Sequence, residues 1–382
     1  MSQEDLLAVA QSDGDAARAS GDVVLEVDGL TVSFPTDDGL VQAVRGVSYQ
    51  LRRGEVLGIV GESGSGKSVT SMAVMGLLPG TARVTGSVRF GDQELLGAPD
   101  AALAKIRGRR IAMIFQDPMT SLNPVYTVGY QIAEAVRAHH DVSKAAALKR
   151  ARQLLEIVRI PNAEARLGNY PHELSGGMRQ RVVIAIAMAN DPDVIIADEP
   201  TTALDVTVQA QIMEALDTAR QETGAAMVLI THDLGVIAGQ ADRVLVMYAG
   251  KLVESGSAED VFYTPRMPYS LGLLGSLPRL DRPSERLTPI PGAPPSLVNM
   301  PPGCPFTPRC PLARPVCDEE EPELTATTSP DHTAACHFSD ELVGAEAGQL
   351  FRTTVADAAA LAEFVRETDA LENQAEPQDQ PK

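Results

Sequence analysis

The stretch GEVLGIVGESGSGKSVTSMAVMGLL, residues 54–78, decides the fold that the sequence predicts. It begins with an apolar run typical of a buried strand, passes through a glycine-rich loop, and ends in a helical apolar pattern that stops before Pro79. The loop, Gly61–Ser68, matches the pattern G-x-x-x-x-G-K-[ST]. An ordinary glycine-rich turn with an incidental lysine is the alternative. The strand before the loop and the helix after it favour a phosphate-binding loop in an α/β domain.

Each part of this loop has an expected role at a nucleoside triphosphate. Glycines let backbone N–H groups converge on phosphate oxygens, and the helix that follows adds its positive end. Lys67 places a cation beside the β- and γ-phosphates, and the Ser68 hydroxyl suits Mg²⁺. We therefore expect ATP and Mg²⁺ as cofactors. The expected ATP contacts here are Gly61, Ser63, Gly64, Ser65, Gly66, Lys67 and Ser68.

Two carboxylates follow another apolar run, DVIIADEP, residues 193–200. Taken alone, such carboxylates could simply face solvent at the end of a strand. Beside a phosphate loop, Asp198 would hold Mg²⁺ through water and Glu199 would polarise the attacking water. The sequence therefore predicts ATP hydrolysis, with Glu199 and Lys67 among the catalytic residues.

The segment LSGGMRQR, residues 174–181, resembles the signature motif of ATP-binding-cassette (ABC) ATPases, also in its distance before ADEP. Taken alone, Ser-Gly-Gly is an ordinary helix start. Ser175 and the N–H groups of Gly176 and Gly177 would open a helix whose N-terminus favours an anion. In the family that anion is the γ-phosphate held by the opposite subunit. The resemblance therefore implies that two cassettes close head-to-tail around two ATP molecules.

Four further residues take family roles by position. Gln116 in MIFQDP corresponds to the Q-loop glutamine, which contacts Mg²⁺ and senses the membrane partner. Asp205, at the end of TTALD, corresponds to the D-loop and is placed among the ATP contacts. His232 in LITHD corresponds to the catalytic switch histidine, although a lone histidine after a strand is more often structural. Phe34 is assigned to stacking on adenine, where many relatives have tyrosine.

Three segments narrow the resemblance to the subgroup that energises dipeptide and oligopeptide importers. They are FQDPMTSLNPVYTVGYQI, TPRMPYSLGLLGSLP and PGAPPSLVNMPPGCPFTPRC. The resemblance, over roughly residues 23–340, implies a second and often non-identical cassette subunit, two membrane-spanning permease subunits and an extracytoplasmic substrate-binding protein. Importers of nickel chelates, glutathione and some oligosaccharides share the subgroup, so the cargo stays open. The expected activity is ATP hydrolysis coupled to peptide import.

The expected fold class is α/β: a P-loop NTPase ABC cassette with a RecA-like core, an antiparallel β subdomain and a helical subdomain. DVIIADEP, AAMVLITHD and DRVLVMYAG predict buried parallel strands. A proline-rich, cysteine-containing C-terminal domain is expected to follow. The expected boundaries are a disordered tail at 1–22, a nucleotide-binding domain at 23–257 with its helical subdomain at about 97–190, a C-terminal domain at 258–340, and a helical, polar tail at 341–382.

The composition argues against one class of partner and indicates where the protein is located. The chain of 382 residues has 32 basic and 51 acidic residues, a formal net charge of −19, which argues against a dedicated nucleic-acid binder. No apolar run approaches the roughly 18–20 residues of a membrane span, and the acidic start is no secretory signal. We therefore expect a peripheral protein on the cytoplasmic face of the cell membrane, docked onto other chains.

The four cysteines all lie between Cys304 and Cys336, with Cys310 and Cys317 between them. A disulfide is disfavoured in a reducing cytosol, and the spacing lacks the tight knuckles of structural zinc sites. Iron–sulfur clusters also use four cysteines, and some members of the resembled subgroup carry a [4Fe–4S] cluster at such a set. A [4Fe–4S] cluster, zinc and unligated buried thiols stay open as alternatives.

Two other functions were weighed against an importer ATPase. A soluble cassette protein acting on ribosomes or DNA usually has two cassettes, a long coiled-coil insertion or basic arms, and this sequence shows none of these. A regulatory subunit with an inactive site conflicts with intact Lys67, Asp198, Glu199 and His232. The sequence therefore favours an active ATPase.

Overall fold

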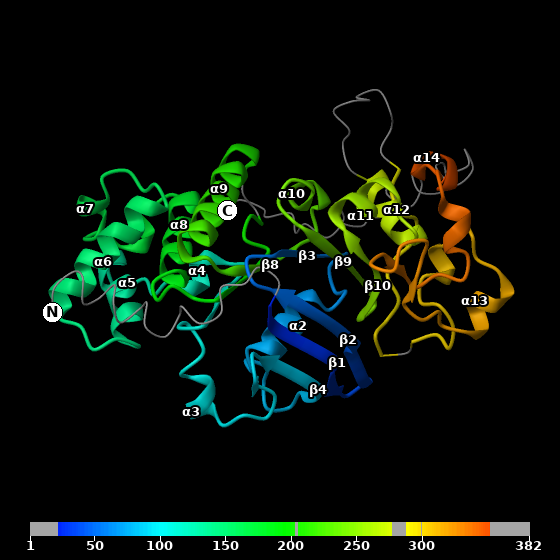
Figure 1. The fold of residues 1–382 in the computed structure, drawn as a ribbon, viewed down its shortest axis with the longest axis horizontal. Helices are drawn as coiled ribbons and strands as arrows, with labels where there is room; N and C mark the ends of the chain where they lie inside the picture. Colours follow the sequence, from blue (N-terminus) through cyan, green and yellow to red (C-terminus); the bar gives the residue numbers. More distant parts are fainter. Residues whose placement is uncertain (1–21, 203–204, 277–287, 299, 352–382) are drawn as a thin grey trace, which may run out of the picture.

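The computed structural model describes residues 22–202, 205–276, 288–298 and 300–351. Two sheets lie at its centre, with helices α5–α7 at one end and the C-terminal region at the other (Figure 1). The disorder predicted for residues 1–22 and the helix predicted within 341–382 fall outside the described residues, apart from Asp22 and residues 341–351.

The main sheet has eight strands among the described residues, in the order β11-β12-β10-β9-β3-β8-β7-β6. Every residue of the central strands β3, β7 and β8 is buried. The runs predicted as buried strands are indeed β7, β8 and β9, and the α/β fold class is confirmed. The parallel strands are β3 (Val56–Val60), β6 (Ile111–Ile114), β7 (Val194–Asp198), β8 (Ala226–Thr231) and β9 (Arg243–Tyr248); the antiparallel ones are β10 (Lys251–Ser257), β11 (Thr325–Ala326) and β12 (Thr333–Ala334).

A second, antiparallel sheet of order β2-β1-β4-β5 packs against one face of the main sheet. Side chains alternate across a strand, so Leu57 and Ile59 of β3 face this second sheet, whereas Val56 and Val60 face the helices on the other side. Both faces of the central strands are thus covered, which explains their continuous apolar sequence. The second sheet contains β1 (Val23–Thr36), β2 (Gly39–Arg52), β4 (Arg83–Phe90) and β5 (Gln93–Glu94).

The region expected to be mostly helical, 97–190, contains one element of the main sheet, the strand β6. Its helices start at side-chain caps where the sequence provides them: Thr127, Ser143 and Ser175 each accept a hydrogen bond from a backbone N–H three residues ahead. The helices are α3 (Asp100–Leu103), α4 (Pro118–Ser121), α5 (Val128–Arg137), α6 (Lys144–Ile157), α7 (Ala163–Arg166) and α8 (Gly176–Ala187), with the 3-10 turn η1 (Pro171–Glu173).

The remaining helices connect the strands or belong to the C-terminal region. That region has no separate core in its described part, because Phe306, Ala335 and Phe351 join the same apolar cluster as the helices and the main sheet. Its strand β12 also pairs with β10. These elements are α2 (Lys67–Val74), α9 (Val206–Thr223), α10 (Leu234–Ala238), α11 (Ala258–Tyr263), α12 (Pro268–Gly275), η2 (Thr307–Arg309), α13 (Pro315–Glu319), η3 (Ser339–Leu342) and α14 (Ala347–Leu350).

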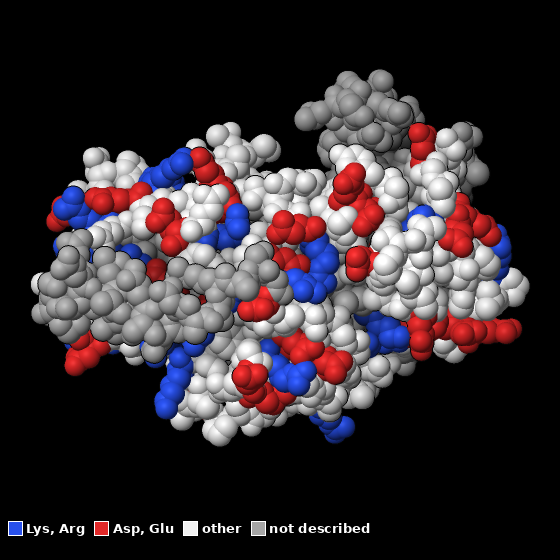
Figure 2. Space-filling view, viewed as in Figure 1, with Lys and Arg blue, Asp and Glu red and all other residues white. Residues whose placement is uncertain are grey.

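On the face drawn in Figure 2, lysine and arginine side chains are scattered among acidic ones and form no broad basic patch. Within the described residues, no helix is both long and apolar enough to cross a membrane.

The helical region depends on apolar contacts at α6, which gives a stability test. Leu154 is completely buried, so Leu154→Ala should lower the free energy of unfolding by about 2–5 kcal/mol through lost contacts and a residual cavity. Urea titration followed by circular dichroism measures the change. The matched control is Leu324→Ala, at a side chain 38% exposed, which we expect to alter stability by less than about 1 kcal/mol. Equal losses in the two variants would contradict this assignment of the core.

Candidate nucleotide-binding and hydrolysis site

The phosphate loop lies between β3 and α2, as its sequence predicts. Lys67 is buried, and its ammonium donates to the carbonyl oxygens of Gly61 at 2.8 Å and Glu62 at 3.0 Å. Burial lowers the pKa of Lys67, and the nearby carboxylates of Glu199, Asp198 and Glu62 oppose that shift. The loop therefore holds a cation close to three carboxylates, at a position where phosphate oxygens would bind it.

Glycine is required at one position of this loop for two reasons. Gly66 caps α2 with a φ of 101°, a conformation that residues with a Cβ rarely adopt. A Cβ at Gly66 would also lie 2.4 Å from the carbonyl oxygen of Ala43. The antiparallel sheet, which contributes Ala43, thus closes directly onto the start of the phosphate-binding helix.

Ser68 and Asp198 provide a pair of oxygen ligands. The Ser68 hydroxyl donates to Asp198 Oδ1 at 2.9 Å. Burial raises the pKa of Asp198, while the Ser68 hydrogen bond and the charge of Lys67 act in the opposite direction. A hydroxyl and a carboxylate at adjacent positions are the hard ligands that Mg²⁺ prefers, so these residues fit the predicted magnesium site.

Glu199 is the point at which three loops meet. Its Oε2 accepts hydrogen bonds from Gln116 Nε2 at 3.0 Å and Thr202 Oγ1 at 2.9 Å, and it lies 3.2 Å from His232 Nδ1. Glu199 also has a φ of 46°, which is strained for a residue with a side chain. The structure therefore brings the predicted base, the Q-loop glutamine and the switch histidine together.

The register of the parallel strands produces this meeting. Val60 pairs with Thr231 across β3 and β8, and Asp198 pairs with Ile230 across β7 and β8. The strands end at one level, so the loops that follow them emerge side by side. The phosphate loop, the Asp198–Glu199 pair and His232 are therefore neighbours, although the chain separates them widely.

Three parts of the predicted site have structural contacts of their own in the described residues. Ser175 is exposed and caps α8, and no hydrogen bond or ion pair joins it to the phosphate loop of the same chain among the described contacts. Gly177 lets α8 approach α9, since a Cβ there would lie 2.6 Å from Val208 Cγ1. Asp205 caps α9 by accepting from the N–H of Val208. Phe34 is partly buried against the core of the antiparallel sheet.

Two contacts at the loop were not predicted from sequence. Glu62, inside the phosphate loop, forms a two-pronged ion pair with Arg309 of the C-terminal region, and its N–H donates to the Tyr269 hydroxyl. A signal was present: a carboxylate among the residues that must bind phosphate calls for a neutralising cation. The residue that supplies this cation could not be predicted, because Arg309 lies 247 positions away in the sequence. Thr202, which donates to Glu199, was also not predicted.

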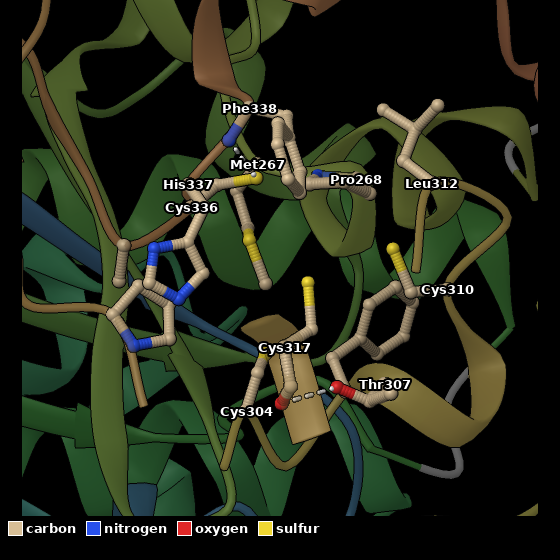
Figure 3. A pocket seen from close by; sticks show the side chains of 13 residues that line it. Met267, Pro268, Cys304, Thr307, Cys310, Leu312, Cys317, Cys336, His337 and Phe338 are labelled. Carbon is tan, nitrogen blue, oxygen red and sulfur yellow. Dashed lines mark hydrogen bonds between the residues drawn. The ribbon is translucent and has the colours of Figure 1, made fainter. Parts of the chain in front are cut away.

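All four cysteines are free thiols and line one pocket of the C-terminal region. In Figure 3 the side chains of Cys310, Cys317 and Cys336 approach the same hollow from different segments. Cys304 N–H donates to the Cys317 carbonyl at 2.7 Å, and Phe338 N–H donates to Cys336 Sγ at 3.4 Å.

Burial raises the pKa of the Cys310 thiol to about 12 and that of Cys336 to about 11, and it also raises the pKa of Cys304. Burial thus favours the neutral form of these three thiols. No group of three or more ligand side chains within the described residues is arranged to hold a metal ion. Two histidines lie close in sequence to Cys336. His332 contacts buried Glu254 at 2.8 Å, and His337 lines the pocket with its Nε2 3.1 Å from the Glu320 carbonyl oxygen.

A phosphate loop after a central strand, carboxylates after β7 and a histidine after β8 define the chain as a P-loop NTPase of the ATP-binding-cassette class. Residues 44–202 match the ABC transporter family, and residues 253–317 match the C-terminal region of oligopeptide/dipeptide transporters. The chain belongs to the ATP-binding proteins of the oligopeptide/dipeptide ABC transporter family.

Relatives of known name support this assignment. The dipeptide transport ATP-binding protein of Bacillus subtilis (strain 168) is 54% identical over 320 residues, 83% of this chain and 95% of that protein. The oligopeptide transport ATP-binding protein of Escherichia coli (strain K12) is 53% identical, over 80% of this chain and 91% of that protein. The oligopeptide transport ATP-binding protein of Mycobacterium tuberculosis is 57% identical over 86% of this chain, which spans about half (54%) of that longer protein.

Solved structures agree on the cassette. A dimeric, post-hydrolysis ATP-binding cassette bound to ADP and Pi matches with a TM-score of 0.56 and 28% identity, over 61% of this chain and 98% of that chain. A second dimeric structure of the same cassette, described as a bacterial ABC transporter cassette, matches with a TM-score of 0.55 and 29% identity, over 61% of this chain and 98% of that chain.

The contact at Gly66 gives a test of the phosphate loop. Gly66→Ala should weaken ATP binding more than about tenfold, because the new Cβ meets the Ala43 carbonyl and the required φ is strained. Gly224→Ala is the matched control, since it also has a positive φ, of 68°, with nothing within 4 Å of the added atom. Titration with a fluorescent ATP analogue compares the two. Wild-type affinity in Gly66→Ala would show that the loop does not hold the phosphates.

Proposed function

We propose that this chain binds and hydrolyses ATP with Mg²⁺ and thereby powers import of dipeptides or oligopeptides through a membrane complex. The observation that carries the proposal is the convergence of Gln116, Thr202 and His232 on Glu199, beside a complete phosphate loop. The named relatives support the cargo class, since they are dipeptide and oligopeptide transport proteins.

Binding would begin at Lys67. Its two present acceptors are backbone carbonyls of Gly61 and Glu62, and β- and γ-phosphate oxygens are stronger, charged acceptors for the same ammonium. Ser68 and Asp198 would hold Mg²⁺, which neutralises charge developing on the phosphates. The loop then binds and orients the triphosphate with groups that are already in place.

Hydrolysis would use Glu199 as the residue that accepts a proton from the attacking water. Thr202 and Gln116 fix its carboxylate by hydrogen bonds, and His232 lies against the same oxygen. The side chain of His232 is 58% exposed, and in this proposal it would contact the γ-phosphate and the water. Fixing a strained residue from three sides keeps the base oriented before substrate arrives.

A second cassette is required in this proposal. Ser175 and Gly176 are exposed at the N-terminus of the twelve-residue helix α8, and such an end attracts phosphate. They would therefore complete the site of a partner subunit, as the dimeric arrangement of the related solved cassettes suggests.

The membrane subunits would dock beside Gln116. Large apolar side chains are exposed along the segment from Phe115 to Tyr130, with Val125 at 70% and Met119 at 56%. Exposed apolar groups gathered in this way mark a protein-binding surface. Contact there would couple a permease to Glu199 through Gln116 and place the chain on the cytoplasmic face of the membrane, with the extracytoplasmic binding protein contacted only through the permeases. Nucleic acid is no partner in this proposal.

We also propose that Cys304, Cys310, Cys317 and Cys336 hold a [4Fe–4S] cluster. Four thiols line one pocket and come from separate turns of one region, and thiolates are the ligands that such clusters use. Binding would have to draw these side chains together, because no group of three or more ligands in the described residues is already arranged for a metal ion. When bound, the cluster would stabilise a region that is poor in regular structure by joining its segments. Phe306 and Thr307, which also line the pocket, position the segment between Cys304 and Cys310.

Glu199→Gln should lower the rate of ATP hydrolysis at least about 10²-fold while ATP affinity is retained, because the amide keeps its volume and hydrogen bonds but cannot accept the proton. Phosphate release by the purified full-length chain, with ATP binding measured in parallel, tests this. The control is Glu222→Gln, at an exposed position of α9, which should hydrolyse ATP as the wild type does. Unchanged turnover in Glu199→Gln would refute the assignment of the base.

Anaerobically purified chain should contain about four iron and four sulfide per polypeptide and absorb visible light. Cys310→Ser should lose most of that iron, because one of four ligands is replaced. Elemental analysis and electron paramagnetic resonance after reduction are the measurements. Stoichiometric zinc, or no metal in freshly isolated protein, would contradict the cluster.

A further inference from the structure

Arg309 connects the C-terminal region to the phosphate loop. Its guanidinium donates to both carboxylate oxygens of Glu62 at 2.7 Å. It also donates to the Pro291 carbonyl at 3.0 Å and to the Tyr248 hydroxyl at 3.3 Å. Only 4% of the Arg309 side chain is exposed. A planar guanidinium held at several donors and removed from water is a fixed charge, not a mobile surface group.

All the polar groups of Glu62 have partners in this arrangement. The N–H donates to the Tyr269 hydroxyl at 2.8 Å, and the carbonyl accepts from Lys67 Nζ at 3.0 Å. The same carbonyl accepts from the N–H of Ser65 at 3.2 Å. Tyr269 and Arg309 are therefore connected to Lys67 through their contacts with Glu62. A displacement of Arg309 would be transmitted to the carbonyl that now holds the Lys67 ammonium.

The charge of Glu62 also requires this partner. An uncompensated carboxylate two residues before Gly64 would repel the phosphates that the loop must bind. Arg309 cancels that charge, whereas the Lys67 ammonium is engaged by backbone carbonyls. Breaking a partly buried pair by removing one partner leaves the other charge uncompensated, which is costly.

We propose that Arg309 is a positioning residue for ATP binding, acting through Glu62 to neutralise the carboxylate that would otherwise repel the phosphates from the loop. This deepens the proposed function and rests on it. The alternative is that the ion pair merely anchors the C-terminal region. The two explanations predict different ATP affinities when both charges are removed. If the ion pair is only an anchor, the double variant lacks the anchor and binds ATP weakly. If Arg309 neutralises Glu62, the double variant has no carboxylate to repel the phosphates and its ATP affinity recovers.

The test compares Arg309→Gln, Glu62→Gln and the double variant in the full-length chain. Arg309→Gln should raise KM for ATP and Kd for a non-hydrolysable ATP analogue by about tenfold, with a smaller change in kcat. Glu62→Gln should have a smaller effect, because it removes the repelling charge. The double variant should recover to within about threefold of wild type. Arg309→Lys, which keeps the charge and loses the two-pronged geometry, should lie between Arg309→Gln and wild type.

Glu321→Gln is the matched control. Glu321 also joins the C-terminal region to the cassette, through Arg45 and Lys251 at 2.7 and 2.8 Å, but it does not contact Glu62. It should leave Kd for the analogue unchanged. Equal weakening in Arg309→Gln and the double variant, with melting temperatures lowered in parallel, would overturn the proposal in favour of a simple anchor. A wild-type chain that binds the analogue without hydrolysing ATP would refute the proposed function and leave the binding comparison valid.

Discussion

The register of the parallel strands is the constraint on which the rest of this structure depends. Strands β3, β7 and β8 are buried along their whole length. A shift of one residue would exchange the side chains fitted against the second sheet with those fitted against the helices. The strand ends are therefore fixed relative to one another. That fixed level places Lys67, Asp198 and His232 at one edge of the sheet, and it allows the Glu199 carboxylate to touch side chains from the loops after β6 and β8.

Sequence alone predicted those features that depend on neighbours in the chain. The strand, glycine loop and helix around Lys67 follow from local pattern, and DVIIADEP supplied both the buried strand and its carboxylates. Position within the family then indicated Gln116 and His232, which do meet at Glu199. The strand β6 was missed because four apolar residues inside a helical region show no distinguishing period.

Contacts between distant segments could not be predicted. Nothing near Arg309 indicates that it pairs with Glu62, and the pairing needs β9 and α12 to present Tyr248 and Tyr269 at the same place. The roles of Ser175, Asp205 and Phe34 depend on a nucleotide and a second subunit, so they stay predictions. The cysteines were grouped correctly by sequence, since they line one pocket, but their ligand follows from neither spacing nor packing alone.

The C-terminal region has a further consequence for how the molecule behaves in solution. The described main sheet ends on one side in β11 and β12, each two residues long, and on the other in the four-residue β6. Without β12, the seven-residue strand β10 would offer unpaired backbone groups to other chains. Short edge strands leave few such groups. The C-terminal region thus ends the described sheet in short strands, whose few open backbone groups offer little for another chain to pair with.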